Sequence, residues 1–357
     1  MPTSEIRVGL VGYGPAGSFF HAPLIAATPG LRLAAVVTRD PAKADLVRQA
    51  HPGAEVVGSA SDLWSRSDLV VIASPNSTHV PLAQEAIKQG LPVVVDKPLT
   101  GTAAQGRELV RLADDHGVML TVFQNRRWDG DFLTIRRLLP ELGEVRRFES
   151  RFERWRPVPK GGWREMGGAD DVAGVLYDLG SHLADQALQL FGPVTHVYAE
   201  SDVRRAGVRA DDDAFIALTH AGGTRSHLWM SAVAADLGPR FRVLGSAGAY
   251  VEWGLDLQEE RLRAGARPGD DGWGTEPPER WGTFGAGDDV RTVATEPGAY
   301  QEFYAGVAAA LLEGAPPPVA PGSAIETIAV LEAAAHSAAT GQTVALTETL
   351  NEAPTGA

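Results

Sequence analysis

Two side chains that could transfer a proton lie four residues apart in the middle of the chain, at Asp178 and His182. On a helix this spacing places both side chains on one face, one turn apart. A neighbouring carboxylate orients an imidazole ring and favours its protonation, which suits the ring to act as a general base. Residues 175–190 carry apolar side chains at helical spacing. The sequence therefore predicts a buried helix that carries this pair, with a surface pair without chemistry as the alternative.

A glycine-rich turn near the N-terminus is typical of a dinucleotide site. An apolar run over residues 6–11 predicts a strand, and a helical pattern follows the turn to residue 27. In the intervening G-x-G-x-x-G the glycines permit, in order, a tight turn, close approach to a pyrophosphate, and helix–strand packing. The helix start adds free N–H groups for phosphate. A glycine-rich turn of another doubly wound fold is the alternative. The residues expected to contact the cofactor here are Gly12, Tyr13, Gly14, Pro15, Ala16 and Gly17.

The end of the second predicted strand, residues 31–38, bears on the choice of cofactor. Enzymes that use NAD usually place an acidic residue here to bind the ribose 2′-hydroxyl, whereas this chain has Thr38 and Arg39. A hydroxyl and a planar guanidinium suit a 2′-phosphate better. We therefore expect NADP rather than NAD, unless Arg39 pairs with the following Asp40 or is simply solvated.

Strands and helices alternate over the first 125 residues, which is the pattern of a doubly wound parallel sheet. Ligands bind beyond the carboxyl ends of such strands, where segments 74–79 and 96–98 lie. A lysine there can donate a hydrogen bond to a ligand, although a surface lysine is the common alternative, and Asn76 could instead cap the next helix. The residues of these segments expected at the site are Ser74, Pro75, Asn76, His79, Asp96 and Lys97.

The pattern changes after residue 125. Candidate strands follow one another without intervening helices over residues 194–253, which predicts an open, mainly antiparallel sheet with helices on one face. Residues 267–297 are rich in Gly, Pro and Asp, and we expect them to be irregular. The predicted fold class is α/β plus α+β. A Rossmann domain is expected over residues 1–125 and a substrate-binding and oligomerisation domain over 126–357, with the last helices allowed to pack back on the first domain.

The composition excludes several classes of partner. The chain has 357 residues, a formal net charge of −13 and no cysteine. An acidic chain is unsuited to nucleic acid or an anionic membrane, and the lack of cysteine removes disulfides and thiol chemistry. The histidines show no metal-ligand spacing, so we expect no metal. We see no signal peptide and no apolar run long enough to span a membrane, and we expect a cytoplasmic protein.

Three separated motifs together resemble the Gfo/Idh/MocA family of glucose–fructose oxidoreductase and inositol dehydrogenase. They are the glycine-rich turn, Asp96-Lys97-Pro98, and Gly174-x-x-x-Asp178-x-x-x-His182. The family usually has Glu-Lys-Pro, and Asp96 keeps the carboxylate on a shorter side chain. This variant, with segments 124–129 and 176–186, resembles the subgroup of scyllo-inositol dehydrogenases. The resemblance covers nearly the whole chain.

The resemblance implies an NAD(P)-dependent dehydrogenase acting on a secondary alcohol of a sugar or cyclic polyol. Lys97 and His182 would contact the reacting hydroxyl, His182 as the general base, with Asp178 beside them. Relatives commonly cover the open sheet by assembly, so we expect a homodimer or homotetramer through the C-terminal sheet. Two alternatives stay open on the same fold: a nicotinamide-binding sensor or regulator that does no chemistry, and an NAD-dependent glycoside hydrolase. Further cofactor contacts are expected from Asn125 and from the Trp163-Arg164 pair.

Overall fold

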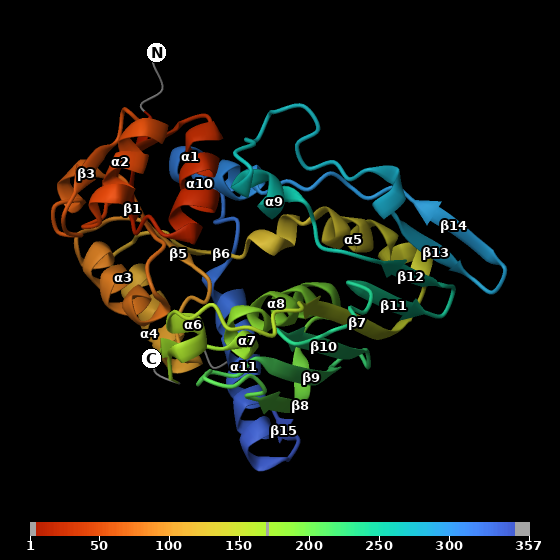
Figure 1. Cartoon of the computed structure of the whole chain (residues 1–357). Coiled ribbons are helices and arrows are strands. Elements are labelled where there is room, and N and C mark those ends of the chain that lie inside the picture. Colours follow the sequence, from red (N-terminus) through yellow and green to blue (C-terminus); the bar gives the residue numbers. More distant parts are fainter. Residues whose placement is uncertain (1–4, 169–170, 347–357) are drawn as a thin grey trace, which may run out of the picture. The chain divides into compact units, whose positions relative to one another are not determined.

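The computed structural model describes residues 5–168 and 171–346 (Figure 1). The chain divides into two compact units. The first comprises residues 1–130, 256–275 and 297–325, and the second comprises 131–255, 276–296 and 326–357. The sequence placed the division at residue 125. The structure instead adds five residues to the N-terminal part of the first unit and returns two later segments to it.

The first unit is built on a six-stranded parallel sheet with the strand order β3-β2-β1-β4-β5-β6. Every residue of β4 is buried, as expected for a parallel strand covered on both faces. The strand order and the parallel pairing confirm the predicted doubly wound Rossmann sheet. The strands are β1 (Ile6–Val11), β2 (Leu31–Val37), β3 (Glu55–Val57), β4 (Leu69–Ile72), β5 (Val93–Asp96) and β6 (Leu120–Phe123).

The helix after the glycine-rich turn departs from the predicted regular helix. It starts as a π-helix, η1 (Ala16–His21), and continues as α1 (Ala22–Ala27). Pro23 lies in the first turn of α1 and lacks the N–H that regular pairing would use there. The other helices of this unit are α2 (Pro41–Ala50), η2 (Trp64–Arg66), η3 (Asn76–Thr78), α3 (His79–Lys88), α4 (Ala103–Asp115), η4 (Asn125–Trp128), α9 (Gln258–Arg263) and α10 (Gln301–Glu313).

A late segment of the chain completes the core of the first unit. The hydroxyl of Thr121 on β6 donates to the carbonyl oxygen of Val319 at 2.8 Å. The ring of Phe123 packs against those of Phe303 and Tyr304 on α10, with centroids 4.9 and 6.0 Å apart. Residues nearly two hundred positions apart in sequence therefore share one hydrophobic core.

The second unit is built on a nine-stranded sheet with the order β14-β13-β12-β11-β7-β10-β9-β8-β15. All neighbours pair antiparallel except β7 and β10, which are parallel. This confirms the predicted open, mainly antiparallel sheet. The strands are β7 (Val145–Glu153), β8 (Val194–Asp202), β9 (Asp213–His220), β10 (Arg225–Ser231), β11 (Phe241–Gly245), β12 (Ala249–Glu252), β13 (Gly282–Ala286), β14 (Asp289–Val293) and β15 (Val344–Ala345).

Helices cover one face of this sheet. Buried side chains of α5 (Gly130–Leu142), α8 (Gly180–Phe191) and α11 (Pro321–Thr340) form one hydrophobic core with the strands. Three shorter helices are α6 (Trp163–Met166), α7 (Val175–Asp178) and η6 (Pro278–Arg280). The expectation that residues 267–297 are irregular is wrong over β13 and β14, which extend the sheet because β13 pairs with β12 and β14 with β13. Across the two described ranges, no helix is long and apolar enough to cross a membrane.

Candidate active site

The three glycines of the N-terminal turn have different surroundings, and these match their predicted roles. Gly12 has φ +99°, and a Cβ there would lie 2.7 Å from the carbonyl oxygen of Ala73. A Cβ on Gly17 would lie 2.1 Å from the carbonyl oxygen of Gly12. Gly14 instead faces open space, with no atom within 4 Å of the position of a Cβ. The turn is therefore packed tightly at both ends and open in the middle, where a pyrophosphate would fit.

The remaining residues of the turn shape it through packing and its backbone. Pro15 precedes η1 and Ala16 begins it, and the hydroxyl of Ser18 donates to the carbonyl oxygen of Gly14 at 2.9 Å. The ring of Tyr13 is buried and packs edge-on against His51, with centroids 6.4 Å apart. Tyr13 thus helps to anchor the turn to the region that follows α2.

At the end of β2, the side chain of Asp40 is held by α2. Its carboxylate accepts the backbone N–H groups of Ala42 at 3.0 Å and Lys43 at 3.4 Å, and lies 3.8 Å from the Lys43 ammonium. The Thr38 hydroxyl accepts the Asp40 N–H at 3.2 Å, while Arg39 is exposed. Asp40 therefore serves as the N-cap of α2. Arg39 lies just past the end of β2, and a second cation that the sequence did not single out, Lys43, lies in the first turn of α2.

The loops after β4 and β5 are joined by the ring of His79. Its Nδ1 lies 2.8 Å from the carbonyl oxygen of Pro98, and its Nε2 lies 3.0 Å from that of Ser74. The ring is 1% exposed. Both ring nitrogens face carbonyl groups inside the unit, so His79 joins the two loops that the sequence placed at the cofactor. The predicted cofactor contact of His79 stays a prediction.

Asn76, in the loop after β4, is not the N-cap of the helix that follows. Asn76 begins the 3₁₀ turn η3, and the N-cap of α3 is Thr78. The hydroxyls of Ser74 and Thr78 lie 2.6 Å apart, and the Thr78 hydroxyl donates to the carbonyl oxygen of Pro75 at 2.7 Å. The loop is therefore ordered by its own hydroxyls, and Asn76 is partly exposed beside it.

Lys97 follows β5 directly and is partly exposed. The carboxylate of Asp96 accepts the Lys97 backbone N–H at 2.9 Å, and the Lys97–Pro98 peptide bond is cis. Asn125 begins η4 directly after the neighbouring strand β6 and is 5% exposed. Asp96 thus holds the lysine backbone, a local role that the Asp-Lys-Pro motif alone did not reveal.

In the second unit, Asp178 and His182 lie on two consecutive helices and not on one. Asp178 ends α7, a turn follows at Leu179, and His182 lies in the first turn of α8. The His182 ring is 6% exposed and stacks near Phe152, with centroids 6.5 Å apart. The prediction of one continuous buried helix is therefore wrong in its continuity. The spacing of four residues is unchanged, and the joint action of this pair with Lys97 stays a prediction.

Asp178 has a cationic neighbour on α6. The Nε of Arg164 lies 3.4 Å from Oδ1 of Asp178, and the Arg164 guanidinium lies 4.7 Å from the ring centroid of Trp163. The sequence placed this Trp-Arg pair at the cofactor. Within the second unit, the structure places Arg164 in an ion pair with the predicted catalytic carboxylate of Asp178.

The start of α7 is held by Asp211, a residue that the sequence reasoning missed. Its carboxylate accepts the Leu176 N–H at 2.7 Å, and its own carbonyl oxygen accepts the Val175 N–H at 3.0 Å. Burial is the largest influence on Asp211 and raises its pKa to about 6, although these backbone hydrogen bonds oppose the rise. Gly174 makes this possible, because a Cβ there would lie 1.8 Å from Oδ1 of Asp211.

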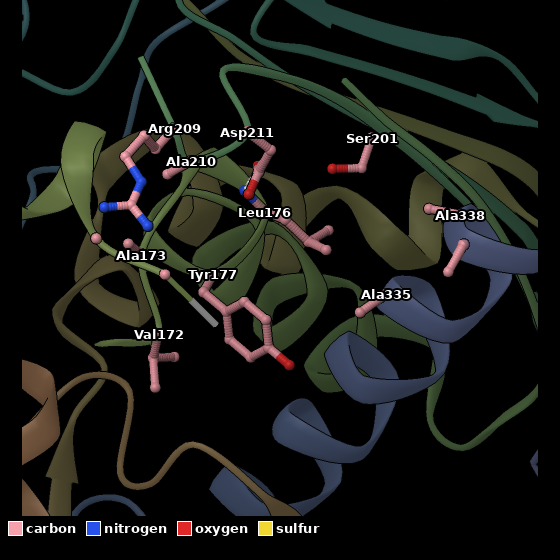
Figure 2. Close-up of a pocket in the computed structure, with 13 residues that line it drawn as sticks. Val172, Ala173, Leu176, Tyr177, Ser201, Arg209, Ala210, Asp211, Ala335 and Ala338 are labelled. Atoms are coloured by element: carbon pink, nitrogen blue, oxygen red, sulfur yellow. Dashed lines mark hydrogen bonds between the residues drawn. The ribbon is translucent and has the colours of Figure 1, made fainter. Parts of the chain in front are cut away.

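A pocket of about 420 Å³ lies beside α7 in the second unit. Figure 2 shows Asp211, Arg209 and Tyr177 at this pocket, with Ala335 and Ala338 of α11 on another side. Burial, followed by the charges of Glu332 and Asp211, raises the pKa of Tyr177 to about 12. Neither predicted catalytic residue of this unit is among the lining residues. The pocket therefore adjoins the helix that carries Asp178 without including that side chain.

The fold and these local sites define a class of protein. A doubly wound parallel sheet with a glycine turn open at its centre is the architecture of a nicotinamide dinucleotide domain. Comparison with known families agrees with this assignment. Residues 6–124 match the description "Oxidoreductase family, NAD-binding Rossmann fold", and residues 137–346 match "Oxidoreductase family, C-terminal alpha/beta domain".

Individual relatives resemble the chain over nearly its whole length. It is 42% identical over 342 residues to the uncharacterized oxidoreductase YdgJ of Escherichia coli, covering 94% of this chain and 97% of that one. It is 35% identical over 349 residues to the scyllo-inositol 2-dehydrogenase (NADP(+)) IolW of Bacillus subtilis, covering 96% of each. The solved structure of the oxidoreductase YvaA from Bacillus subtilis superposes with a TM-score of 0.91 at 34% identity, covering 97% of this chain and all of that one. The chain belongs to the Gfo/Idh/MocA family of NAD(P)-binding oxidoreductases.

Proposed function

We propose that the protein is a dehydrogenase that oxidises a secondary alcohol of a sugar or cyclic polyol to a ketone, reversibly and with NADP. The observation that carries this proposal is the open space at Gly14 within a tightly packed turn. A chain that keeps this cradle, together with a lysine after β5 and an Asp–His pair at the family's motif positions, has the parts for hydride transfer from an alcohol.

The chain's own residues supply binding and proton transfer. His182 accepts the proton of the substrate hydroxyl, and Asp178 stabilises the imidazolium that forms. Lys97 donates a hydrogen bond to the substrate oxygen as it becomes a carbonyl. The nicotinamide, when bound, supplies the hydride acceptor for the carbon-bound hydrogen. A general base of this kind contributes about 10² to 10⁴ in rate.

NADP is the proposed cofactor because an exposed guanidinium stands just past the end of β2. Arg39 is exposed there, and the Asp40 carboxylate that could have paired with it is engaged by the start of α2 and by Lys43. A planar guanidinium matches the oxygens of a 2′-phosphate. The relative IolW, which is 35% identical to this chain, is named as an NADP(+)-dependent enzyme, and this supports the same assignment.

The substrate class rests on the same relative. IolW is named as acting on scyllo-inositol, and the match to this chain covers 96% of both proteins. A cyclic polyol presents several equivalent secondary hydroxyls, any of which suits a site with one base and one hydrogen-bond donor. We therefore propose inositols as the first substrates to test and aldoses as the second.

The test is a cofactor titration followed by a substrate screen. Binding of a ligand to the folded state alone raises the thermal midpoint, so NADP and NADPH should act at lower concentrations than NAD and NADH. The preferred oxidised cofactor is then incubated with each polyol, and formation of reduced nicotinamide is followed by absorbance. No thermal shift with any of the four dinucleotides would refute the cofactor proposal. Release of free sugar from a glycoside, without net cofactor reduction, would identify a hydrolase instead.

A further inference from the structure

A chain of buried polar side chains lies behind the loop that carries Lys97. The ring of His21 is completely buried. Its Nδ1 lies 2.6 Å from the hydroxyl of Tyr304, and its Nε2 lies 3.8 Å from Oδ1 of Asp96. Asp96 in turn accepts the backbone N–H of Lys97 at 2.9 Å. Three segments of the first unit thus form one path to the predicted catalytic lysine. Hydrogen bonds join Tyr304 to His21 and Asp96 to the Lys97 backbone, and the middle contact, 3.8 Å between His21 and Asp96, is electrostatic and longer than a hydrogen bond.

The elements that supply these residues explain what the path connects. His21 is the last residue of η1, the helix that begins at the glycine turn, whereas Asp96 ends β5. Phe123 of β6 packs against the His21 ring, with centroids 4.4 Å apart. The path therefore joins the helix that would receive the cofactor phosphates to the loop that would polarise the substrate.

The surroundings of the His21 ring favour a proton on Nε2. A proton there faces the Asp96 carboxylate at 3.8 Å, an electrostatic contact longer than a hydrogen bond, whereas a lone pair there would face a negative charge. Burial, followed by the charge of Asp96, raises the pKa of Tyr304 well above its ordinary value, so the phenol keeps a proton for its 2.6 Å contact with Nδ1. Burial is the largest influence on the pKa of Asp96 and would raise it, but the interactions with His21, Lys97 and His79 together lower it below its ordinary value. The carboxylate is therefore ionised.

The backbone beside Lys97 is held on its other side as well. His79 bridges the carbonyl oxygens of Pro98 and Ser74, while Asp96 holds the Lys97 N–H. The contact between His21 and Asp96 connects this arrangement to η1. A change confined to that contact should therefore act on Lys97 and leave the glycine turn intact.

We propose that His21 is a positioning residue for Lys97. Its Nε2–H steadies the Asp96 carboxylate, which fixes the Lys97 backbone and keeps a negative charge beside the Lys97 ammonium. The position of Lys97 is thereby coupled to that of η1, the helix that begins at the glycine turn. This inference rests on the proposed dehydrogenase function for its kinetic consequence, but its structural content does not depend on turnover.

Two substitutions separate the ring nitrogens of His21. In His21→Asn the side-chain amide reaches the position of Nδ1, so the contact with Tyr304 remains and the contact with Asp96 is lost. In His21→Gln the longer side chain brings an N–H to the position of Nε2. The full-length variants should therefore differ in their effect on Lys97 although both remove the imidazole.

The readout is competitive labelling of amines, measured by mass spectrometry. The chain has four lysines, and Lys43, Lys88 and Lys160 serve as internal references for Lys97. We expect His21→Asn to raise Lys97 labelling about tenfold relative to the references, the scale of one hydrogen bond to a charged group. The reason is that an Asp96 carboxylate that is no longer held by His21 fixes the Lys97 backbone less firmly, so the lysine amine reaches the reagent more often. His21→Gln should stay near the wild-type rate.

Kinetics and a second variant complete the test. With an identified substrate, kcat should fall about tenfold in His21→Asn, while NADP affinity stays unchanged and His21→Gln restores kcat. Asp96→Asn keeps the side-chain size, removes the charge, and should raise Lys97 labelling in the same way, which decides the matter if His21→Asn does not fold. Unchanged Lys97 labelling in Asp96→Asn, or equal labelling in the Asn and Gln variants of His21, would overturn the proposal. Labelling as expected in a protein that oxidises no polyol would refute the proposed function alone.

Discussion

Replacing Gly174 should destabilise the fold more than replacing Gly162, a glycine in nearly the same backbone conformation. It precedes α7 with φ 93° and ψ 166°, and a Cβ there would lie 1.8 Å from Oδ1 of Asp211. Gly162 precedes α6 with φ 101° and ψ 171°, but the space around it is open. Both positions belong to the second unit and have almost the same backbone conformation. A comparison of the two alanine variants therefore isolates the contact with Asp211.

The expected magnitudes follow from these surroundings. Backbone conformations of this kind cost a non-glycine residue about 1–3 kcal/mol, so Gly162→Ala should lower the free energy of unfolding by that amount. Gly174→Ala should cost the same and, in addition, the capping hydrogen bond from Leu176 to Asp211, about 0.5–2 kcal/mol. The total of about 1.5–5 kcal/mol is a large part of a typical stability of about 5–15 kcal/mol.

Urea unfolding of the two variants and of the double variant Gly174→Ala/Asp211→Ala measures these terms. Removing the Asp211 side chain relieves the clash, so the cost of Gly174→Ala should fall to that of Gly162→Ala when it is measured in the Asp211→Ala background. Equal destabilisation by Gly174→Ala and Gly162→Ala in the wild-type background would refute the reasoning. It would mean that Asp211 moves aside at no cost and does not fix the helix that carries Asp178.

Four other outcomes are expected. Arg39→Ala should weaken NADP binding about tenfold or more and leave NAD binding unchanged in a calorimetric titration, because one charged phosphate contact is lost. His182→Ala should reduce single-turnover oxidation about 10²-fold or more while cofactor affinity is kept. Folding raises the pKa of the Asp211 carboxyl from 3.8 to about 6. The stability that this group contributes is therefore present below pH 3.8 and lost as the pH rises through 6. In Asp211→Asn, the free energy of unfolding measured in urea should fall less over this pH range. We also propose that copies of the chain assemble through the outer face of the nine-stranded sheet. Trp229 lies on this face, with its ring centroid 3.9 Å from the Arg151 guanidinium and 5.2 Å from the ring of Phe215. Trp229→Asp should lower the molecular mass measured by light scattering, and a monomeric wild type would contradict the proposal.

The parts of the structure that the sequence predicted are those with local causes. The glycine turn follows from a strand, a spacing of glycines and a helix start that are contiguous in the chain, and the structure gives Gly12 and Gly17 the close contacts that this pattern requires. The parallel sheet likewise follows from short apolar strands that alternate with helices. The order of these strands along the chain is enough to place their carboxyl ends, and hence Lys97, at one edge.

The parts that the sequence did not predict depend on partners far away in the chain. Residues 282–293 look irregular by composition, but they form strands because β13 pairs with the edge of β12 and β14 then pairs with β13. The start of α7 is held by Asp211, more than thirty residues later and two residues before β9, a partner that the local sequence around Asp178 does not reveal. His79 has the motif position of a cofactor ligand, and only the carbonyl groups of Ser74 and Pro98 reveal that it joins two loops.

In each of these cases a polar group or strand edge is satisfied by something remote, and buried polar groups nearly always find such partners. The same rule makes His21 informative. The fully buried His21 ring pairs through Nδ1 with Tyr304 on α10, whereas its Nε2 makes no hydrogen bond and faces the Asp96 carboxylate at the end of β5 at 3.8 Å. The backbone of Lys97 is thus held by Asp96 of its own motif, which in turn faces His21 of a helix that the motif does not include.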